Sequence, residues 1–433
     1  MKTELYFIHV LICLSLSSSS NLRFLASESN TFDYSSIKSV YSNQNISDLE
    51  LISNTADESV IYVSDNNSIK LNISSIIKAG DASNLQNSKY YGVNSAILVN
   101  NAKPGFYHFN ITTNALGSHG ITSVNSARVK AEQLSIHTHK LNSSGLVANY
   151  GGTLRGQYIF VLTFGNASPC LLSEMNNGGM NISNAKIMSQ GLESPLLYTN
   201  GNTIILDKAN ATAFNSQAFV NENGNLSVTN CNIRANGTGV NNDNGLIVMF
   251  SKTGAESFLT TENTNYQLMG NNTIPILYIT NTIAKIDIKQ CSFVGQASTF
   301  LNVSGNNNGW GTVGDNGGIV ELNLVNQDIV GDIVVDSSSY LVINMKNSTI
   351  KGKINNAKTA ASMEINLDAD SSIELTGNSY YTELNNDDNT GSNINKNSFT
   401  FEEYEENFNI VTSSSKKMNP LMLILILLLV ISF

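Results

Sequence analysis

The chain has 433 residues, a formal net charge of −10, and only 13% charged residues against 41% hydrophobic ones. Such an acidic chain lacks the basic surface that nucleic-acid binding requires, so no nucleic-acid partner is expected. A length of 433 residues would ordinarily indicate several globular domains, but a solenoid grows linearly with its repeats and escapes that limit.

Residues 1–26 have the pattern of a secretory signal peptide. Lys2 provides a positive start, Leu5 to Leu16 is a short apolar run, and Ala26 lies among small residues where cleavage could fall. The alternative is an N-terminal membrane anchor, but the run is shorter than the roughly 20 residues that span a bilayer. Residues 27–54 are polar and weakly patterned, and we expect a lead-in segment and an N-terminal cap that covers exposed strand edges.

A short phrase recurs between Ala96 and Leu301, in which a small or turn residue precedes a large apolar residue and a second strand-former. Successive phrases are 23 to 30 residues apart, and a period in the twenties without a break indicates a solenoid. The same phrase at Val60–Val63 precedes the series, and the excess length before Ala96 is an insertion at Gly80–Asn94. We expect the central residues to stack in one column: Ile97, Ile121, Leu146, Leu171, Leu196, Phe219, Leu246, Ile276 and Phe300.

A second run with two-residue alternation follows each phrase, for example at Leu226–Thr229 and Ile286–Lys289. Such alternation places one face of a strand inward and the other outward. The connectors are rich in Asn, Gly, Ser and Thr, which suit tight turns, and nothing between the runs has the length or the apolar spacing of the helix that a leucine-rich or ankyrin unit needs. The sequence therefore predicts an all-β fold, a single-stranded parallel β-helix of about a dozen coils with polar turns over residues 55–405.

The coils are expected to shorten after Gly317, where alternating runs lie about 21 to 22 residues apart. Thr382–Asn397 is polar and is predicted to be a loop, and Phe399–Phe401 is predicted to supply the closing strand. Residues 406–420 form a polar tether. Residues 421–433 are a hydrophobic tail, too short for an ordinary spanning helix of about 20 residues. Ser413 is the expected attachment site of a GPI anchor, and a short tail anchor is the alternative.

Several blocks resemble recurring elements of one family: Ser59–Val63, Tyr91–Ala96, Tyr150–Thr153, Val228–Cys231, Trp310–Thr312 with Asn316–Gly318, and Gly331–Asp336. The chain resembles secreted, right-handed parallel β-helix repeat proteins of the pectate-lyase-like fold group, which are adhesin-like or carbohydrate-binding. The resemblance covers roughly residues 50–405, and the Trp310 and Gly331 blocks are its more specific part. It implies a right-handed coil, as the crossover rule also favours, and a surface role without demonstrated catalysis.

Three cysteines remain beyond the signal peptide: Cys170, Cys231 and Cys291. Cys231 and Cys291 occupy equivalent places two coils apart, a separation of about 9.6 Å at about 4.8 Å per coil. A disulfide requires Cα atoms within about 7 Å, so no bond between them is expected. We also predict an amide column formed by Asn230, Asn265 and Gln290.

The chain contains many N-glycosylation sequons, each a plausible glycan site on a secreted protein. The asparagines are Asn45, Asn66, Asn72, Asn110, Asn142, Asn166, Asn181, Asn210, Asn225, Asn236, Asn271, Asn302 and Asn347. Asn166 is handicapped because Pro169 follows its acceptor Ser168.

An enzymatic function would require carboxylates that converge from adjacent coils. The carboxylates between residues 96 and 300 are Glu132, Glu174, Glu193, Asp207, Glu222, Asp243, Glu256, Glu262 and Asp287, and no two are expected to share a column in neighbouring coils. Arg128, Arg155 and Arg234 are isolated, which disfavours a lyase. No catalytic residue and no cofactor is predicted.

The histidines and the single tryptophan are the candidates for metal binding and sugar binding. His137 and His139 lie two apart on one strand face, with His108 and His119 upstream, but exposed histidines are expected there rather than a metal site. Trp310, in a loop of Gly and Asn, is the best single residue for stacking on a sugar ring, although packing in a turn is the simpler role.

The sequence thus favours a non-enzymatic, glycosylated cell-surface protein that presents a repetitive polar face for adhesion or carbohydrate contact. The expected partners are an extracellular polysaccharide or another cell surface, with the membrane reached through the C-terminal tail or a lipid anchor. A polysaccharide lyase or glycoside hydrolase on the same fold is the alternative. Ice or mineral binding is a weaker one, because it needs a Thr-rich column that the mixed strand residues do not provide.

Overall fold

The structure is a computed structural model that describes residues 34–40, 45–47, 50–64, 70–72, 74–239 and 243–405. The expected signal peptide, polar tether, hydrophobic tail and Ser413 lie outside the described residues, as does Asn66. Within the described part, nearly all of the regular secondary structure is β-strand. Its strands form an all-parallel β-solenoid, which confirms the predicted fold class.

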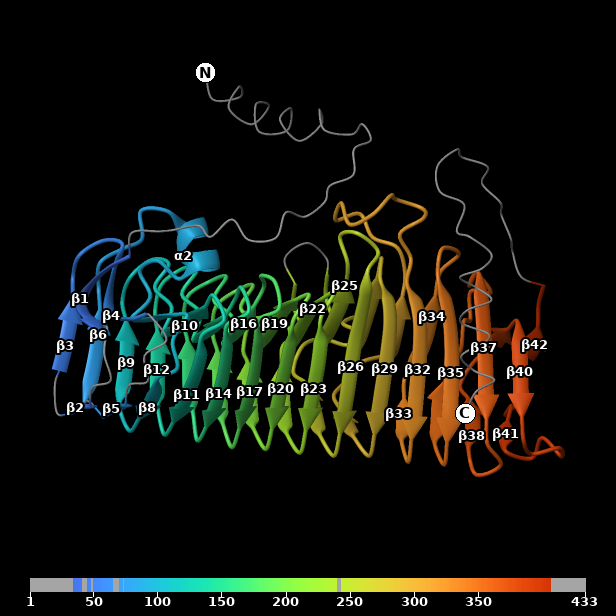
Figure 1. Ribbon diagram of the computed structural model, residues 1–433. Helices are drawn as coiled ribbons and strands as arrows, with labels where there is room; N and C mark the ends of the chain where they lie inside the picture. The colour runs from blue at the N-terminus through green and yellow to red at the C-terminus, as the bar shows by residue number, and fades with distance from the viewer. Residues whose placement is uncertain are drawn as a thin grey trace, which may run out of the picture. The chain divides into compact units, whose positions relative to one another are not determined.

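Three long parallel sheets, A, B and C, run side by side along the stack (Figure 1), and most coils contribute one strand to each in turn. Sheet A contains β1 (Ser35–Val40), β4 (Glu58–Val63), β7 (Ile97–Asn100), β10 (Ile121–Val124), β13 (Leu146–Ala148), β16 (Leu171–Ser173), β19 (Leu197–Asn200), β22 (Phe219–Glu222), β25 (Ile247–Phe250), β28 (Leu277–Thr280), β31 (Thr299–Val303) and β34 (Asp332–Val335).

Sheet B has 14 strands, so the stack is slightly longer than the expected dozen coils. They are β2 (Asn45–Ser47), β5 (Lys70–Asn72), β8 (Gly105–Tyr107), β11 (Arg128–Glu132), β14 (Thr153–Gln157), β17 (Gly179–Ser183), β20 (Thr203–Asp207), β23 (Asn225–Thr229), β26 (Glu256–Glu262), β29 (Ile283–Lys289), β32 (Ile319–Val325), β35 (Tyr340–Lys346), β37 (Ser362–Leu367) and β40 (Glu383–Asn386).

Sheet C and two small sheets complete the coils. Sheet C contains β3 (Glu50–Ser53), β6 (Ser75–Lys78), β9 (Asn110–Thr113), β12 (Ser135–Thr138), β15 (Phe160–Thr163), β18 (Lys186–Ser189), β21 (Asn210–Ala213), β24 (Asn232–Ala235), β27 (Asn265–Leu268) and β30 (Ser292–Val294). The small sheets contain β33 (Asp328–Val330), β36 (Thr349–Gly352), β38 (Ser372–Leu375) and β41 (Ile394–Asn395), then β39 (Ser379–Tyr381) and β42 (Phe401–Glu403).

The predicted apolar column exists on the inner face of sheet A, with a one-residue correction in four coils. The paired residues are Ile97, Ile121, Leu146, Leu171, Leu197, Phe219, Ile247, Leu277 and Leu301. Leu196 was predicted in place of Leu197 because both are apolar and follow Pro195. The backbone N–H groups of Leu196 and Leu197 both donate to the carbonyl of Ala218. This coil therefore has one extra residue at this point, and the paired position moves from Leu196 to Leu197.

The coil stack begins before the predicted start at residue 55, and near its other end strands replace a predicted loop. β1 pairs with β4, so residues 35–53, expected to be a lead-in and cap, contribute a first coil. At the other end β40 pairs with β37, so the predicted loop at 382–397 contains strands. The closing strand β42 begins at Phe401 rather than at Phe399. The shorter terminal coils are confirmed by the pairing of Ile319 with Tyr340 and of Tyr340 with Ser362.

The corner between sheets B and C places one residue in left-handed conformation in successive coils. Asn230, Asn263 and Gln290 share this position, with φ of 55°, 50° and 51°. Asn is among the residues that tolerate this conformation best. The predicted column of Asn230, Asn265 and Gln290 is therefore wrong in its middle member, because a shift of two residues preserves the inward and outward pattern. Asn265 instead donates through Nδ2 to Asn232 Oδ1 at 2.9 Å.

Thr264 separates Cys231 from Cys291, which confirms that the two thiols lie two coils apart. The Cys231 N–H donates to Thr264 Oγ1 at 3.2 Å, and the Ser292 N–H donates to the Thr264 carbonyl. All three cysteines in the described residues are free and buried.

Uncharged polar side chains stack on their copies along the outer face of sheet B. Asn385, Asn366 and Asn344 each donate through Nδ2 to the amide oxygen of the preceding coil, at 2.9, 2.8 and 2.8 Å. The series ends where Asn323 donates to Asp287 at 2.8 Å. This stacking explains why a solenoid can be poor in charge, since like charges at this spacing would repel.

Candidate functional site

The outer face of sheet A differs from the polar outer face of sheet B, because one of its columns is apolar. This column consists of Leu98, Thr122, Val147, Leu172, Tyr198, Val220, Val248 and Tyr278. All except Tyr198 are buried, although they point away from the central core. Two insertions cover the ends of the column and leave Tyr198 half-buried between them.

The first insertion, at 80–94, contains the helix α2 (Leu85–Tyr91), which projects from the stack in Figure 1. Asn84 caps it by accepting from the N–H groups of Gln86 and Asn87 at 2.9 and 3.0 Å. Gly92 ends it at φ 76°, a conformation that glycine adopts without strain. A Cβ on Gly92 would lie 2.5 Å from Thr122 and 2.8 Å from Leu98, so the insertion packs directly on the apolar column.

Asn149 fixes the end of α2 to sheet A. Its Nδ2 donates to the carbonyls of Lys89 and Tyr90 at 3.2 and 3.1 Å, while its Oδ1 accepts from the Glu174 N–H at 2.9 Å. This one side chain thus fixes the backbone of Lys89 relative to that of Glu174.

The second insertion lies between β31 and β32 and carries Trp310. Two buried asparagines hold the Trp310 carbonyl, with donation from Asn306 at 3.1 Å and from Asn316 at 2.8 Å. The Trp310 ring stacks on Phe250 with ring centroids 3.8 Å apart and an interplanar angle of 17°. The packing role considered for Trp310 is therefore present, and the half-buried ring also lines a pocket.

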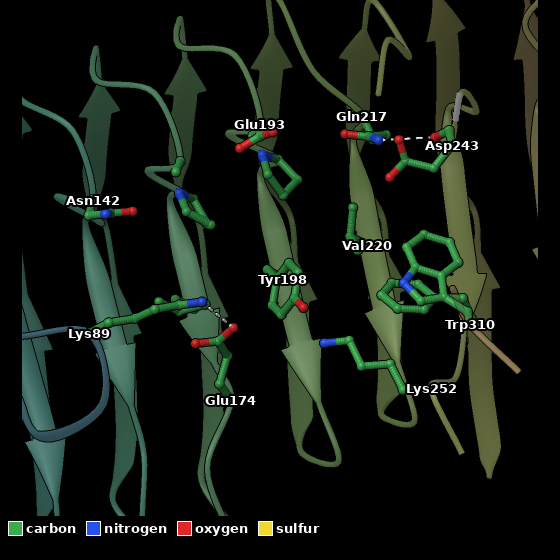
Figure 2. A pocket seen from close by; sticks show the side chains of 15 residues that line it. Lys89, Asn142, Glu174, Glu193, Tyr198, Gln217, Val220, Asp243, Lys252 and Trp310 are labelled. Atoms are coloured by element: carbon green, nitrogen blue, oxygen red, sulfur yellow. Dashed lines mark hydrogen bonds and ion pairs between the residues drawn. The ribbon is translucent and has the colours of Figure 1, made fainter. Parts of the chain in front are cut away.

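A pocket of about 300 Å³ lies between the two insertions, and we call it the sheet A pocket. Figure 2 shows Lys89 entering from one side and Trp310 standing at the other, with Tyr198 between them. Its upper rim in that view carries Asn142, Glu193, Gln217 and Asp243. The pocket thus combines aromatic rings with polar and charged groups from strands of several coils and from both insertions.

Glu174 is the most buried ionisable group that lines the pocket, with a side chain only 6% exposed. Lys89 Nζ lies 2.8 Å from its Oε1, and the Oε2 atom has no hydrogen-bond partner. Burial raises the pKa of Glu174, and the charge of Lys89 opposes that effect. An unpaired carboxylate oxygen in such a place is costly to bury.

Glu222 belongs to the same column as Glu174, two coils further along. Glu222 pairs with Asn200. In the preceding coil Ser173 pairs with Thr199, so the next residue, Glu174, lies opposite Asn200. Tyr198 donates from its hydroxyl to Glu222 Oε2 at 2.7 Å, and Lys252 Nζ lies 3.2 Å from Oε1. Burial and the nearby charge of Glu222 raise the pKa of Tyr198 well above its ordinary value. Glu222 itself does not line the pocket; it holds the Tyr198 ring and Lys252 in place.

The expectation that no two carboxylates of the central coils share a column in neighbouring coils agrees with the register. It did not consider a separation of two coils, where Glu174 and Glu222 lie. Lys89, Tyr198 and Lys252 were not predicted from the sequence. The insertion at 80–94 was the only available signal for Lys89, and nothing in the period marks Tyr198, which occupies an ordinary strand position.

The histidines do not converge on a metal site. His137 packs edge-on against Phe160 and His139 stacks on Phe164, with ring centroids 5.3 and 4.6 Å apart. His119 is fully buried rather than exposed, and its Nδ1 accepts from the Ser144 N–H at 2.9 Å. Across the described ranges, no group of three or more His, Cys, Asp or Glu residues is placed to hold a metal ion.

Most sequon asparagines that the structure describes lie on the surface. The exposed ones are Asn110, Asn166, Asn181, Asn210, Asn225, Asn271 and Asn347, and the half-buried ones are Asn142, Asn236 and Asn302. The side chains of Asn45 and Asn72 lie outside the described part. Asn142 stands on the rim of the sheet A pocket.

No protein-family model matches the chain, and no curated protein matches it significantly. The class that the structure itself defines is therefore a parallel β-solenoid with a lateral pocket between two insertions. No helix in the described part of the chain has the length and apolar character needed to cross a membrane.

Proposed function

We propose that this protein binds polysaccharide chains in the sheet A pocket and does so as a non-enzymatic cell-surface protein. The observation that carries the proposal is the Trp310–Phe250 stack at one side of a pocket whose centre holds Tyr198. Aromatic faces provide apolar area for a sugar ring, and the neighbouring polar groups can orient its hydroxyls.

The floor of the pocket is built from successive parallel strands, so a stretch of a glycan chain can lie across them between the two insertions. The ladders of the other faces have their amide groups bonded to one another, as Asn366 is to Asn344. They therefore offer fewer unused polar atoms to a ligand than the pocket does.

A glycan-array screen of the purified full chain, followed by calorimetry on the best oligosaccharide, tests the proposal. Replacing Trp310 by alanine should weaken binding roughly tenfold, because a stacking surface is removed. The matched control is Tyr158→Ala, since Tyr158 is 54% exposed and lies on the corner between β14 and β15, away from the pocket lining. Equal affinities of the wild type and the Trp310 variant, with unchanged melting temperatures, would contradict the proposal.

Hydrolysis is the second candidate, and the raised pKa of Glu174 in a pocket favours it. A glycosidase also needs a second carboxylate that reaches the substrate. Glu222, which shares the column, is engaged by Tyr198 and Lys252 instead, so the second carboxylate would have to be Glu193 or Asp243 on the rim of the pocket. A reducing-sugar assay on the same glycans separates the candidates, because release of reducing ends that Glu174→Gln abolishes would replace binding with hydrolysis as the function.

The proposal includes secretion, N-glycosylation and attachment to the extracellular face of the cell membrane. The partner would be an extracellular polysaccharide or another cell surface. The sequence pattern of the two termini and the exposed sequon asparagines support it. Release of the protein from intact cells by a phosphatidylinositol-specific phospholipase tests the GPI anchor. Retention after that treatment would favour the tail anchor.

A further inference from the structure

One sequon asparagine, Asn142, lies on the rim of the sheet A pocket rather than on an open face of the stack. Among the sequon asparagines that the structure describes, Asn142 alone lines the pocket. Figure 2 shows its amide at the upper rim, directed along the rim toward the coils that carry Glu193 and Gln217. A sugar attached to this amide would therefore begin at the edge of the pocket.

The column that contains Asn142 leaves its side chain without a partner. Asn142, Ala167 and Glu193 occupy equivalent positions in successive coils, with φ of 54°, 49° and 53°, and all three line the pocket. Because the side chain of Ala167 ends at Cβ, it cannot continue an amide ladder from Asn142. The Asn142 amide makes no hydrogen bond to another described residue, whereas the neighbouring sequon residue Asn166 accepts from the Leu192 N–H at 3.0 Å.

The pocket has room for sugar rings next to Asn142. Tyr198 belongs to the second coil after that of Asn142, a separation of about 9.6 Å along the stack at about 4.8 Å per coil. The lining of these two coils includes the apolar residues Ala167, Pro169 and Pro195. A volume of about 300 Å³ suits a short oligosaccharide, and the innermost sugars of an N-glycan are uncharged, β-linked N-acetylglucosamine residues.

We infer that the N-glycan on Asn142 occupies the sheet A pocket, with N-acetylglucosamine rings against Tyr198, and that external polysaccharide binds only when this glycan is absent or displaced. This inference rests on the proposed function, because it needs a pocket that accepts sugar rings. A ligand on a short tether has an effective concentration on the order of millimolar, so it competes strongly with a weakly bound ligand from solution. The apparent affinity for external glycan falls with the fraction of chains whose pocket is free.

Trp310, the single tryptophan of the chain, lines the pocket and reports on its occupancy. The full chain is secreted from eukaryotic cells that add N-glycans, and mass spectrometry of glycopeptides measures the occupancy of Asn142. We expect Asn142→Gln to raise acrylamide quenching of Trp310 fluorescence about twofold, and to raise the affinity for tri-N-acetylchitotriose about tenfold, because the tethered competitor is removed. The control Asn225→Gln, at an exposed sequon on the outer face of sheet B, should change neither quantity.

A second variant, Ser144→Ala, removes the sequon but keeps Asn142. It deletes a buried hydroxyl that has no hydrogen-bond partner, so the melting temperature should not fall. It should give the same two increases as Asn142→Gln.

The outcomes separate this inference from the proposed function. An unmodified Asn142 in the secreted protein would overturn the inference, as would equal quenching and equal affinity in the wild type and both variants. The proposed function would stand in those cases if Trp310→Ala still weakens glycan binding. Failure of every tested glycan, including tri-N-acetylchitotriose, to bind the Asn142→Gln variant would overturn both.

Discussion

Two regions of the molecule bury polar side chains, and they satisfy them differently. In the corner between sheets C and A, Ser143, Ser168 and Ser194 occupy one column, which we call the serine corner. The N–H of Ser143 donates to Ser168 Oγ at 2.9 Å, and the N–H of Ser168 donates to Ser194 Oγ at 3.0 Å. Each hydroxyl donates onward to a backbone carbonyl, as Ser168 does to Lys140 at 3.1 Å. In the sheet A pocket Glu174 Oε2 has no partner.

The difference follows from repetition. A residue that recurs in successive coils finds an acceptor for its N–H in the next coil, as Ser118, Ser143 and Ser168 do, so its role is structural even where one hydroxyl, that of Ser118, has no partner. The pocket lies where α2 and the Trp310 insertion interrupt the repeat, and no copy of Glu174 in the adjoining coils completes its bonds. Uncharged groups such as Ser118 Oγ and Ser189 Oγ also lack a partner, so what distinguishes Glu174 is its carboxyl group and its place in the wall of a pocket.

The largest expected effect concerns His119, which lies where the two regions meet. It accepts from the Ser144 N–H of the corner, and its Nε2 lies 3.5 Å from Ser88 Oγ of α2. Burial lowers the pKa of His119 to about 4. Its pKa in the unfolded chain is about 6.5, so the unfolded chain binds the proton first as the pH falls. Stability should be full above about pH 6.5 and fall by roughly 3 kcal/mol toward pH 4.

Urea unfolding of the wild type and His119→Asn between pH 7.5 and 4.5 measures this effect. The variant should lose most of the pH dependence between pH 6.5 and 4.5. The control His108→Asn, at an exposed histidine, should keep it. Parallel pH profiles for the wild type and His119→Asn would show that other groups cause the dependence.

An intermediate effect is expected in the serine corner. Ser168→Ala leaves the Ser143 N–H buried without an acceptor, which should lower the free energy of unfolding by about 1–3 kcal/mol. The matched control is Ser227→Ala, on the half-buried outer face of β23, with an expected change near zero. Urea midpoints at pH 7.5 measure both. Glycan affinity should be unchanged in the Ser168 variant, and a loss of affinity without a loss of stability would erase the distinction between the two regions.

Much of the fold could be predicted because the solenoid repeats its physical constraints in every coil. Alternation identified the strands, and the period identified the stacking of Ile97 on Ile121. Register errors arose where neighbouring residues were interchangeable, as with Leu196 and Leu197, or where a shift of two residues preserved the pattern, as with Asn263 and Asn265. The period carries no information at those positions.

The pocket was less predictable because long-range pairings form it. Trp310 was singled out because a tryptophan in a Gly and Asn loop is conspicuous, and it lines the pocket, whereas its contact with a sugar stays a prediction. Lys89 and Glu174 are 85 residues apart in sequence, and their contact depends on how the insertion folds back over the coils. Only the three-dimensional path of α2 reveals that contact.

The smallest expected effect is chemical protection of Cys170, which lies in the same corner of the coil as the serines. Its Sγ donates to the Met188 carbonyl at 3.2 Å, and burial raises the pKa of Cys170 to about 12. Since the thiolate is the reactive form, iodoacetamide at pH 8 should not label Cys170 in the native chain over an hour, whereas unfolding in urea should expose it. Mass spectrometry of the Cys170 peptide measures the labelling.

Because Ser168 is close in sequence, Ser168→Ala should increase labelling slightly and Ser227→Ala should not. Rapid labelling of the wild type would mean that the corner opens readily, and the repeat would then not confer the rigidity that distinguishes it from the pocket.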